Sequence, residues 1–209
     1  MQLVINQLSK SFGSKLIYHD VSFTFETGVY AIMGKNGVGK SVLMEMLAGV
    51  LPQDGGSIHL SNEGHNSSLS YKKKLVYIPE APTFFPGATG DIFLKFIQSI
   101  KLNQQNLTGM NTLIDGFGLR PHLYTRFSDM SLGTQKKLFL TTLLIGESKL
   151  IIMDEPTNAL DETSIAFLVQ VISNLSKCAI VIIATHDQGF LEKISPTIIK
   201  LDTLPTRKL

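Results

Sequence analysis

Apolar and polar positions alternate at the start of the chain. Residues 3–13 (LVINQLSKSFG) and 19–28 (HDVSFTFETG) both show this pattern, and each stretch ends at a glycine. A period of two is typical of a β-strand with one buried face and one face in water. We therefore expect two antiparallel strands here, followed by a short apolar strand over residues 29–34.

The next segments alternate between the hydrophobic pattern of a helix and that of a strand. Residues 41–52 (SVLMEMLAGVLP) predict a helix that is stopped by Pro52, and short strands are expected at 56–61 and 73–80. Residues 91–102 predict another helix. From that helix to about residue 144 the pattern is helical, with no convincing strand.

The first residue of the helix predicted at 91–102 is Asp91, which is a plausible N-cap. The C-terminal third predicts three apolar strands, at 149–155, 178–187 and 197–202, and a helix at 161–175. Strands alternating with helices at both ends indicate a parallel α/β core, and the helical middle is interpreted as an insertion into it.

Composition narrows the class of protein. The 209 residues are 44% hydrophobic and 17% charged with a net charge of +2, which favours a globular protein and gives no electrostatic case for nucleic acid. The single cysteine, Cys178, is expected to fill the core, and the YKKK cluster at 71–74 to be solvated surface. No signal peptide is recognised, and the apolar runs are far shorter than the roughly 20 residues that span a bilayer. We expect a soluble chain that another chain would have to hold at any membrane.

Residues 34–41 (GKNGVGKS) match G-x-x-x-x-G-K-S between a predicted strand and a predicted helix, the setting of a phosphate-binding P-loop. Its glycines let backbone N–H groups approach phosphate oxygens, and the next helix directs its positive end at them. Lys40 is expected at the β- and γ-phosphates and Ser41 at Mg²⁺.

A pair of acids follows the strand predicted at 149–155. Asp154 and Glu155 fall at its C-terminal end, where open α/β sheets bind their ligands. Asp154 is suited to hold hydrated Mg²⁺, and Glu155 to orient and deprotonate the attacking water. The alternative is a plain strand end with acids there for solubility.

In combination these motifs resemble the ATP-binding-cassette (ABC) transporter ATPases, in particular short cassettes of the ABC-2 exporter type. The resemblance covers nearly the whole chain in the family's order. GKNGVGKS resembles Walker A, IIMDEPTNALD resembles Walker B and the D-loop, IIATHD resembles the H-loop, YIPEAPTFFPGATG the Q-loop region and MSLGTQKK the signature.

The resemblance implies one cassette with a P-loop NTPase core, an antiparallel β subdomain and an inserted helical subdomain. Core and β subdomain would take about 1–84 and 147–209, and the helical subdomain about 85–146. ATP would contact Phe12, the Walker A loop and, on a second cassette, the signature; Phe12 is alternatively core packing. The residues assigned to the nucleotide are Phe12, Gly34, Lys35, Asn36, Gly37, Val38, Gly39, Lys40, Ser41, Val42, Ser131, Gly133 and Asp161.

The family's mechanism assigns the remaining roles. Two cassettes would sandwich two ATP molecules head to tail, as a homodimer or a heterodimer. His186, alternatively a plain strand-end histidine, would contact the γ-phosphate and position the water that Glu155 activates. Asp161 would link the two sites across the dimer. Glu155, His186 and Lys40 are the expected catalytic residues, and Ser41, Glu80 and Asp154 the expected metal ligands.

Two departures from the family pattern stand out. Glu80 occupies the Q-loop position that is usually Gln, and its added negative charge is expected to weaken nucleotide binding slightly or to make the site more metal-dependent. In the signature, Leu132 replaces the first glycine and Thr134 the Gln. Ser131 and Gly133 still supply a hydroxyl and a close-approach backbone, and Leu132 avoids a clash if it points into the helical subdomain. We expect a competent ATPase of reduced turnover, with a binding-only cassette as the alternative.

Three functions fit a cassette: the energy-coupling subunit of a membrane transporter, a soluble ABC ATPase of DNA repair or translation, or a regulatory nucleotide-binding module. A single cassette without a long insertion favours the transporter subunit. It would lie on the cytoplasmic face, bound to a separate integral membrane subunit through the groove around Phe84 and Phe85, either of which is alternatively a core residue. The short C-terminal stretch after the last strand (TLPTRKL) and the Pro–Glu sequence ending at Glu80 favour export.

Overall fold

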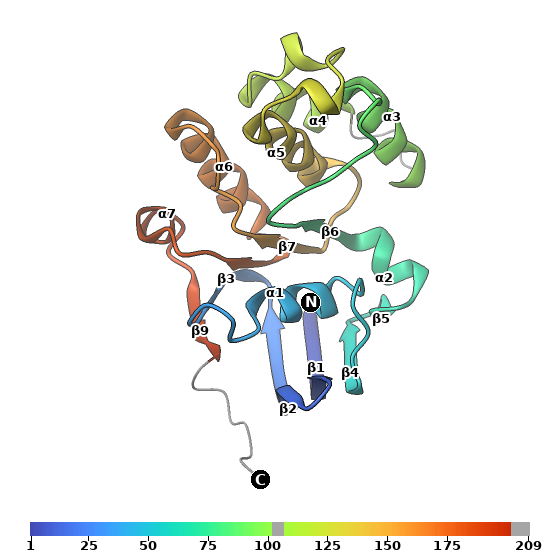
Figure 1. Cartoon of the computed structure of the whole chain (residues 1–209), viewed down its shortest axis with the longest axis vertical. Helices are drawn as coiled ribbons and strands as arrows, with labels where there is room; N and C mark the ends of the chain where they lie inside the picture. Colours follow the sequence, from blue (N-terminus) through green and yellow to red (C-terminus); the bar gives the residue numbers. More distant parts are fainter. Residues whose placement is uncertain (102–106, 202–209) are drawn as a thin grey trace.

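The computed structural model describes residues 1–101 and 107–201 and arranges them as two β-sheets with helices between and around them (Figure 1). Residues 203–209, on which the export expectation partly rests, lie outside the described part of the chain. No helix in the described part is long and apolar enough to cross a membrane.

The N-terminal strands form an antiparallel sheet. Its strand order is β2-β1-β4-β5, and both neighbours of β1 run antiparallel to it. The strands are β1 (Gln2–Phe12), β2 (Lys15–Glu26), β4 (Gly55–Leu60) and β5 (Gly64–His65). The predicted antiparallel pair and the predicted strand at 56–61 are confirmed, whereas the two-residue β5 was not predicted.

The second sheet is parallel throughout its ladder. Its order is β6-β7-β8-β3-β9, with each neighbouring pair parallel. The strands are β3 (Gly28–Met33), β6 (Leu75–Ile78), β7 (Leu150–Asp154), β8 (Ile180–Ala184) and β9 (Thr197–Lys200). The expected parallel α/β core is confirmed, and the carboxyl ends of β3, β7 and β8 meet at one edge.

The helices fall into groups that Figure 1 separates clearly. The helices are α1 (Lys40–Leu47), α2 (Leu69–Lys74), α3 (Gly90–Lys101), α4 (Leu107–Gly116), α5 (Leu132–Leu140), α6 (Glu162–Leu175) and α7 (Gln188–Ile194). Helix α1 lies between the two sheets, and α3, α4 and α5 gather at the far side of the parallel sheet. Short 3₁₀ turns at Arg120–His122, Phe127–Asp129 and Thr141–Leu144 complete the helical middle.

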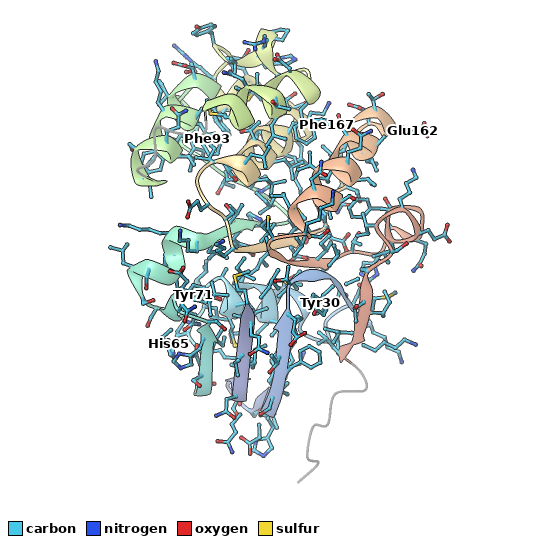
Figure 2. The ribbon with its side chains drawn as sticks, turned by 180° about the vertical axis from the view of Figure 1, so that it is seen from behind. Tyr30, His65, Tyr71, Phe93, Glu162 and Phe167 are labelled. Atoms are coloured by element: carbon cyan, nitrogen blue, oxygen red, sulfur yellow. The ribbon has the colours of Figure 1, made fainter. Side chains whose placement is uncertain are left out.

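The parallel sheet separates two hydrophobic cores. Ile151 and Met153 of β7 face the core shared with the helical middle and α6, whereas Leu150 and Ile152 face α1 and the antiparallel sheet. Successive strand residues point to opposite faces, so a continuous apolar run is the pattern of a strand covered on both sides. In the helical core, Phe93 of α3 packs its ring against Phe127 and other aromatic rings (Figure 2).

Two predicted helix boundaries are wrong. The first helix ends at Leu47, well before Pro52, because Gly49 adopts a left-handed conformation with φ of 62° that closes it. Asp91 is inside the first turn of α3 and is not its N-cap. The hydroxyl of Thr89 accepts from the Ile92 N–H at 3.4 Å and takes that place.

Two surface assignments are also wrong. In the YKKK cluster, Tyr71 (labelled in Figure 2) is fully buried and donates to the Leu47 carbonyl. Lys72 donates to the carbonyls of Ala48 and Gly49 at the C-terminus of α1. This segment is the unpredicted helix α2, and it caps the helix that follows the P-loop. Cys178, expected in the core, is exposed in the turn before β8.

Candidate functional site

The P-loop is the connection between β3 and α1, and two of its glycines need left-handed backbone. Gly37 has a φ of 77° and Gly39 a φ of 115°. A Cβ on Gly39 would lie 2.7 Å from Ile17 and 3.0 Å from the Tyr18 hydroxyl, which itself donates to the Gly39 carbonyl at 2.8 Å. The loop therefore rests on β2, and only glycine fits at position 39.

Lys40 begins α1 and its side chain folds back over the loop. Its ammonium donates to the carbonyl of Gly34 at 2.9 Å and of Lys35 at 3.3 Å. The charge is thus held inside the ring of backbone that precedes the positive end of α1, where an anion is favoured.

Asp154 ends β7 facing this loop. Its side chain is 4% exposed and hydrogen-bonds with the Ser41 hydroxyl. Burial raises the pKa of Asp154, and the neighbouring carboxylates of Glu80 and Glu155 raise it further, against the lowering effect of Ser41. Carboxylate and hydroxyl oxygens side by side are ligands that suit a hard cation such as Mg²⁺.

Glu155, the next residue, has a left-handed backbone with φ of 44°, which is unfavourable for any residue but glycine. Its carboxylate accepts from the Thr185 hydroxyl at 2.9 Å and from the His186 N–H at 3.3 Å. The His186 imidazole lies 3.7 Å from the other carboxylate oxygen. The end of β8 therefore fixes the carboxylate beside the histidine.

One cleft of about 750 Å³ joins most of the predicted site. Eleven of the residues assigned from the sequence line it: Phe12, Asn36, Gly37, Gly39, Lys40, Ser41, Val42, Glu80, Asp154, Glu155 and His186. Gly34, Lys35 and Asn36 line a neighbouring hollow that also reaches His186. Val38 packs instead against the core on the α1 side of the parallel sheet.

Three residues of the cleft were not assigned from the sequence. Lys15 and Ile17 enter it from the start of β2, and Asn158 from the turn after β7. Phe12, which pairs with Lys15 across the β1–β2 ladder, is 48% exposed, and the Lys10 ammonium lies 5.3 Å from the centre of its ring. Thr185, which holds Glu155, was also missed; a hydroxyl next to His186 was the only signal available.

The signature residues lie apart from this cleft. Ser131 is the exposed N-cap of α5, and its hydroxyl accepts from the Thr134 N–H at 3.1 Å. Leu132 does not point into the helical subdomain as expected: it is 53% exposed at the first position of α5. Ser131 and Gly133 are not among the residues lining the cleft, so this chain alone does not bring signature and P-loop together.

Gly133 and Asp161 connect α5 to the turn after β7 within the same chain. A Cβ on Gly133 would lie 2.4 Å from the Ala159 carbonyl, so glycine is required by packing inside the chain. Asp161 caps α6 by accepting from the Ser164 N–H at 2.8 Å and pairs with the Lys137 ammonium at 2.5 Å. Its hydrogen bond with Lys137 holds the pKa of Asp161 well below its usual range.

The two neighbouring phenylalanines predicted at the membrane-subunit groove have different environments. Phe84 is partly buried and stacks with Phe93, Phe96 and Phe127, whereas Phe85 is 70% exposed. Phe84 therefore belongs to the helical core, whereas Phe85, whose ring centre lies 5.1 Å from that of Phe84, lies mostly on the surface.

The chain matches the family model described as ABC transporter over residues 18–158. It is 29% identical over 184 residues to the uncharacterized ABC transporter ATP-binding protein YybJ of Bacillus subtilis, covering 86% of this chain and 83% of YybJ. It is 31% identical to the lantibiotic transport ATP-binding protein SrtF of Streptococcus pyogenes, covering 92% of this chain and 83% of SrtF. A putative ribose/galactose/methyl galactoside import ATP-binding protein of Rhizobium etli is 28% identical over 94% of this chain, which spans only 40% of that protein.

Two solved structures share the fold. An ATP-binding subunit of an ABC transporter superposes with a TM-score of 0.85 at 22% identity, covering 96% of this chain and 85% of that one. A dimeric post-hydrolysis ATP-binding cassette, MJ0796 with ADP and Pi bound, gives a TM-score of 0.82 at 17% identity, covering 95% and 93%. At these identities the likeness establishes the α/β cassette fold with its antiparallel β subdomain.

Proposed function

Because the chain belongs to the ABC transporter family, whose ATP-binding subunits hydrolyse ATP to power transport, we propose that the cleft between the P-loop and the end of β7 is its ATPase site. The observation that carries this proposal is the convergence of Lys40, Asp154, Glu155 and His186 on one cleft from three separate segments, the start of α1 and the ends of β7 and β8. The chain is an ABC transporter ATP-binding subunit, and the roles of its residues follow from their chemistry.

Nucleotide binding would use the P-loop as an anion site. Backbone N–H groups of the loop and the positive end of α1 stabilise phosphate oxygens, and Lys40 exchanges its carbonyl partners for the β- and γ-phosphates. Phe12, half exposed at the opposite wall, would stack on adenine. Lys15 and Ile17 extend that wall beside it.

A magnesium ion fits the oxygen-rich end of the cleft. Ser41 and Asp154 would hold it, with Glu80 facing its water shell. The pKa of Asp154, raised by burial and by the nearby carboxylates, indicates a site short of positive charge. When bound, Mg²⁺ neutralises charge on the transferred phosphoryl group.

For hydrolysis, Glu155 would take a proton from the water that attacks the γ-phosphate. His186 lies beside the same carboxylate and would position that water while contacting the γ-phosphate. Thr185 and the His186 N–H hold the carboxylate on one side, so its direction is fixed by β8 before substrate enters. This arrangement supplies positioning and general-base catalysis from a single chain.

The signature would act on another cassette. ABC cassettes dimerise and work with membrane subunits, and the exposed N-terminus of α5 at Ser131 is suited to a γ-phosphate held by a second cassette. We take that cassette to be a second copy of this chain or a closely related one. Asp161 would sit at the same junction, carrying the contact to the turn after β7.

The membrane subunit would bind the helical part, around Phe85 and on the cytoplasmic face. The helical subdomain is proposed at about 85–146, with the remaining residues forming the core and the β subdomain. Export is the direction that we propose. The relatives include a lantibiotic transport protein and a sugar import protein, so similarity by itself favours neither direction.

Three experiments test the proposal. Purified chain should bind ATP and hydrolyse it in the presence of Mg²⁺, and Lys40→Ala should abolish both activities; wild-type chain that binds no ATP contradicts the site. Affinity purification from solubilised membranes should recover an integral membrane protein, and its absence contradicts the assigned partner. Reconstituting that pair in vesicles, with ATP outside or inside, then measures the direction of transport.

A further inference from the structure

Lys136 is the most deeply buried of the lysines whose side chains the structure describes. Its exposed fraction is 1%, and it lies in the middle of α5, on the face opposite to solvent. An ammonium group in such a place is strongly unfavourable unless it is hydrogen-bonded and compensated by charge. A lysine in this position therefore needs hydrogen-bond acceptors and nearby negative charges that offset the cost of its burial.

The partners are carbonyl groups of two segments that frame the cleft. The Lys136 ammonium donates to the Glu80 carbonyl at 2.6 Å and to the Pro79 carbonyl at 3.3 Å. It also reaches the Asp154 carbonyl at 3.5 Å. Pro79 and Glu80 follow β6, and Asp154 ends β7, which is the neighbour of β6 in the sheet (Figure 1). One side chain of α5 therefore joins the carboxyl ends of two neighbouring strands.

Three carboxylates offset part of the cost of burying this charge. Burial lowers the pKa of Lys136, while Glu80, Asp154 and Glu155 favour its charged form. All three acids line the cleft, and Lys136 is behind them. The ammonium is thus a fixed counter-charge on the protein side of a cluster that must accept the polyanionic phosphates of ATP on its other side.

We propose that Lys136 is a positioning residue for ATP hydrolysis: it ties the Glu80 backbone to the end of β7, and its charge offsets the extra carboxylate that Glu80 introduces. The inference rests on the proposed function of the cleft. It pairs two features of this sequence, a glutamate at position 80 and a buried lysine at position 136. It also connects α5, whose N-cap is Ser131, to the catalytic residues of its own chain.

A double-mutant cycle separates this role from simple packing. The variants are Lys136→Met, Glu80→Gln and the two combined, and Lys193→Met is the matched control because that lysine is exposed on α7. Lys136→Gln is a smaller neutral change that retains a donor and serves if Lys136→Met does not fold. For each we would measure the melting temperature without ligand, the dissociation constant of ATP with and without Mg²⁺, and kcat and KM.

We expect Lys136→Met to lower kcat by about tenfold or more and to weaken ATP binding, because the cluster loses its counter-charge. Adding Glu80→Gln should restore ATP affinity by about three- to tenfold, since it removes the uncompensated carboxylate. Lys136→Gln should keep the melting temperature closer to wild type than Lys136→Met and still lose ATP affinity. Lys193→Met should behave as wild type throughout.

Other outcomes would contradict either the role proposed for Lys136 or the function proposed for the cleft. Equal ATP affinity and kcat in Lys136→Met and wild type would overturn the inference. A loss of melting temperature and activity that Glu80→Gln does not relieve would show that Lys136 only packs, which also overturns it. Failure of wild-type chain to bind ATP at all would instead contradict the function proposed for the cleft.

Discussion

The cleft and the signature segment are both suited to phosphate, but they differ in how complete they are within one chain. The cleft collects residues from β1, the P-loop, the end of β7 and the end of β8 into a single hollow. Ser131 and Gly133 instead stand at the exposed start of α5, away from that hollow. One region can thus be assembled by folding alone, whereas the other needs a second molecule to meet its ligand.

Their backbones differ accordingly. The cleft contains several left-handed residues, including Gly37, Gly39 and the non-glycine Glu155. Such conformations persist only where the surrounding fold holds them. The signature segment is an ordinary helix start, with Ser131 in extended conformation capping α5. Backbone strain is thus found in the cleft, which would hold the reacting groups. The signature segment, which would contact a second cassette, has a regular helix start.

The largest expected effect comes from Glu155→Gln. Losing the general base should lower kcat by about 10²- to 10³-fold while ATP still binds, because the P-loop and Asp154 are untouched. Steady-state phosphate release and nucleotide binding measure the two properties. Size-exclusion chromatography with ATP should show dimers of the variant that do not turn over. Residual hydrolysis near the wild-type rate would mean that another group activates the water.

The next effect tests whether the two regions act on different chains. Lys40→Ala and Ser131→Arg should each reduce hydrolysis about tenfold or more. Mixed in equal amounts, the two variants should recover roughly a quarter of the wild-type rate if the chain forms a homodimer, because half of the dimers are mixed and each has one intact site. No recovery would mean that the signature serves its own chain or that the dimer needs a different cassette. Lys193→Met mixed with either variant is the matched control.

A smaller effect is expected on the outer wall of the cleft. Phe12→Ala removes the half-exposed ring that would stack on adenine, and should weaken ATP binding about five- to twentyfold, the lower part of the range for one base–aromatic stack. Triphosphate without a base should bind both proteins alike. Equal losses for ATP and for triphosphate would show that Phe12 supports the loop and not the base.

Motifs contiguous in the sequence allowed much of the site to be predicted. The P-loop, Asp154, Glu155 and His186 each end or follow an apolar strand, and the carboxyl ends of β3, β7 and β8 meet at one sheet edge. Lys15 and Ile17 were missed because only the pairing of β1 with β2 carries them to the cleft. Neither residue propensity nor the hydrophobic period of a strand indicates that this pairing brings the start of β2 to the cleft.

Lysines and glycines show a second limit of the sequence. Lys72 and Lys136 look like solvated helix residues, yet one caps α1 and the other is buried behind the carboxylates. Gly133 was expected to allow close approach to phosphate, whereas its missing Cβ is required by the Ala159 carbonyl of the same chain. In each case the deciding contact joins residues more than twenty positions apart, which no local pattern records.

The next prediction concerns Asp154→Asn, which should stabilise the protein without ligand although it abolishes hydrolysis. The pKa of Asp154 is raised by burial, so its ionised form is less favourable in the folded than in the unfolded chain. At pH 7 this destabilises the protein, and the cost shrinks as the pH falls toward the ordinary pKa of aspartate. Asp154→Asn should therefore raise the melting temperature without ligand by about 2–4 °C at pH 7 and abolish hydrolysis. An unchanged or lower melting temperature in scanning calorimetry would contradict this account.

The smallest effect is expected from Leu132→Gly, which gives the signature the family's first glycine. Leu132 is 53% exposed and makes the first turn of α5, so its removal costs little packing and up to about 1 kcal/mol of helix propensity. The melting temperature should fall by no more than about 4 °C. Since more than half of Leu132 is exposed, we attribute a change in turnover at an unchanged melting temperature to its contact with the second cassette. We expect a two- to threefold rise in kcat, because the hydrogen-bond donors at the start of α5 can then approach the phosphate more closely. A fall in kcat at unchanged melting temperature would instead identify Leu132 as a packing contact between cassettes.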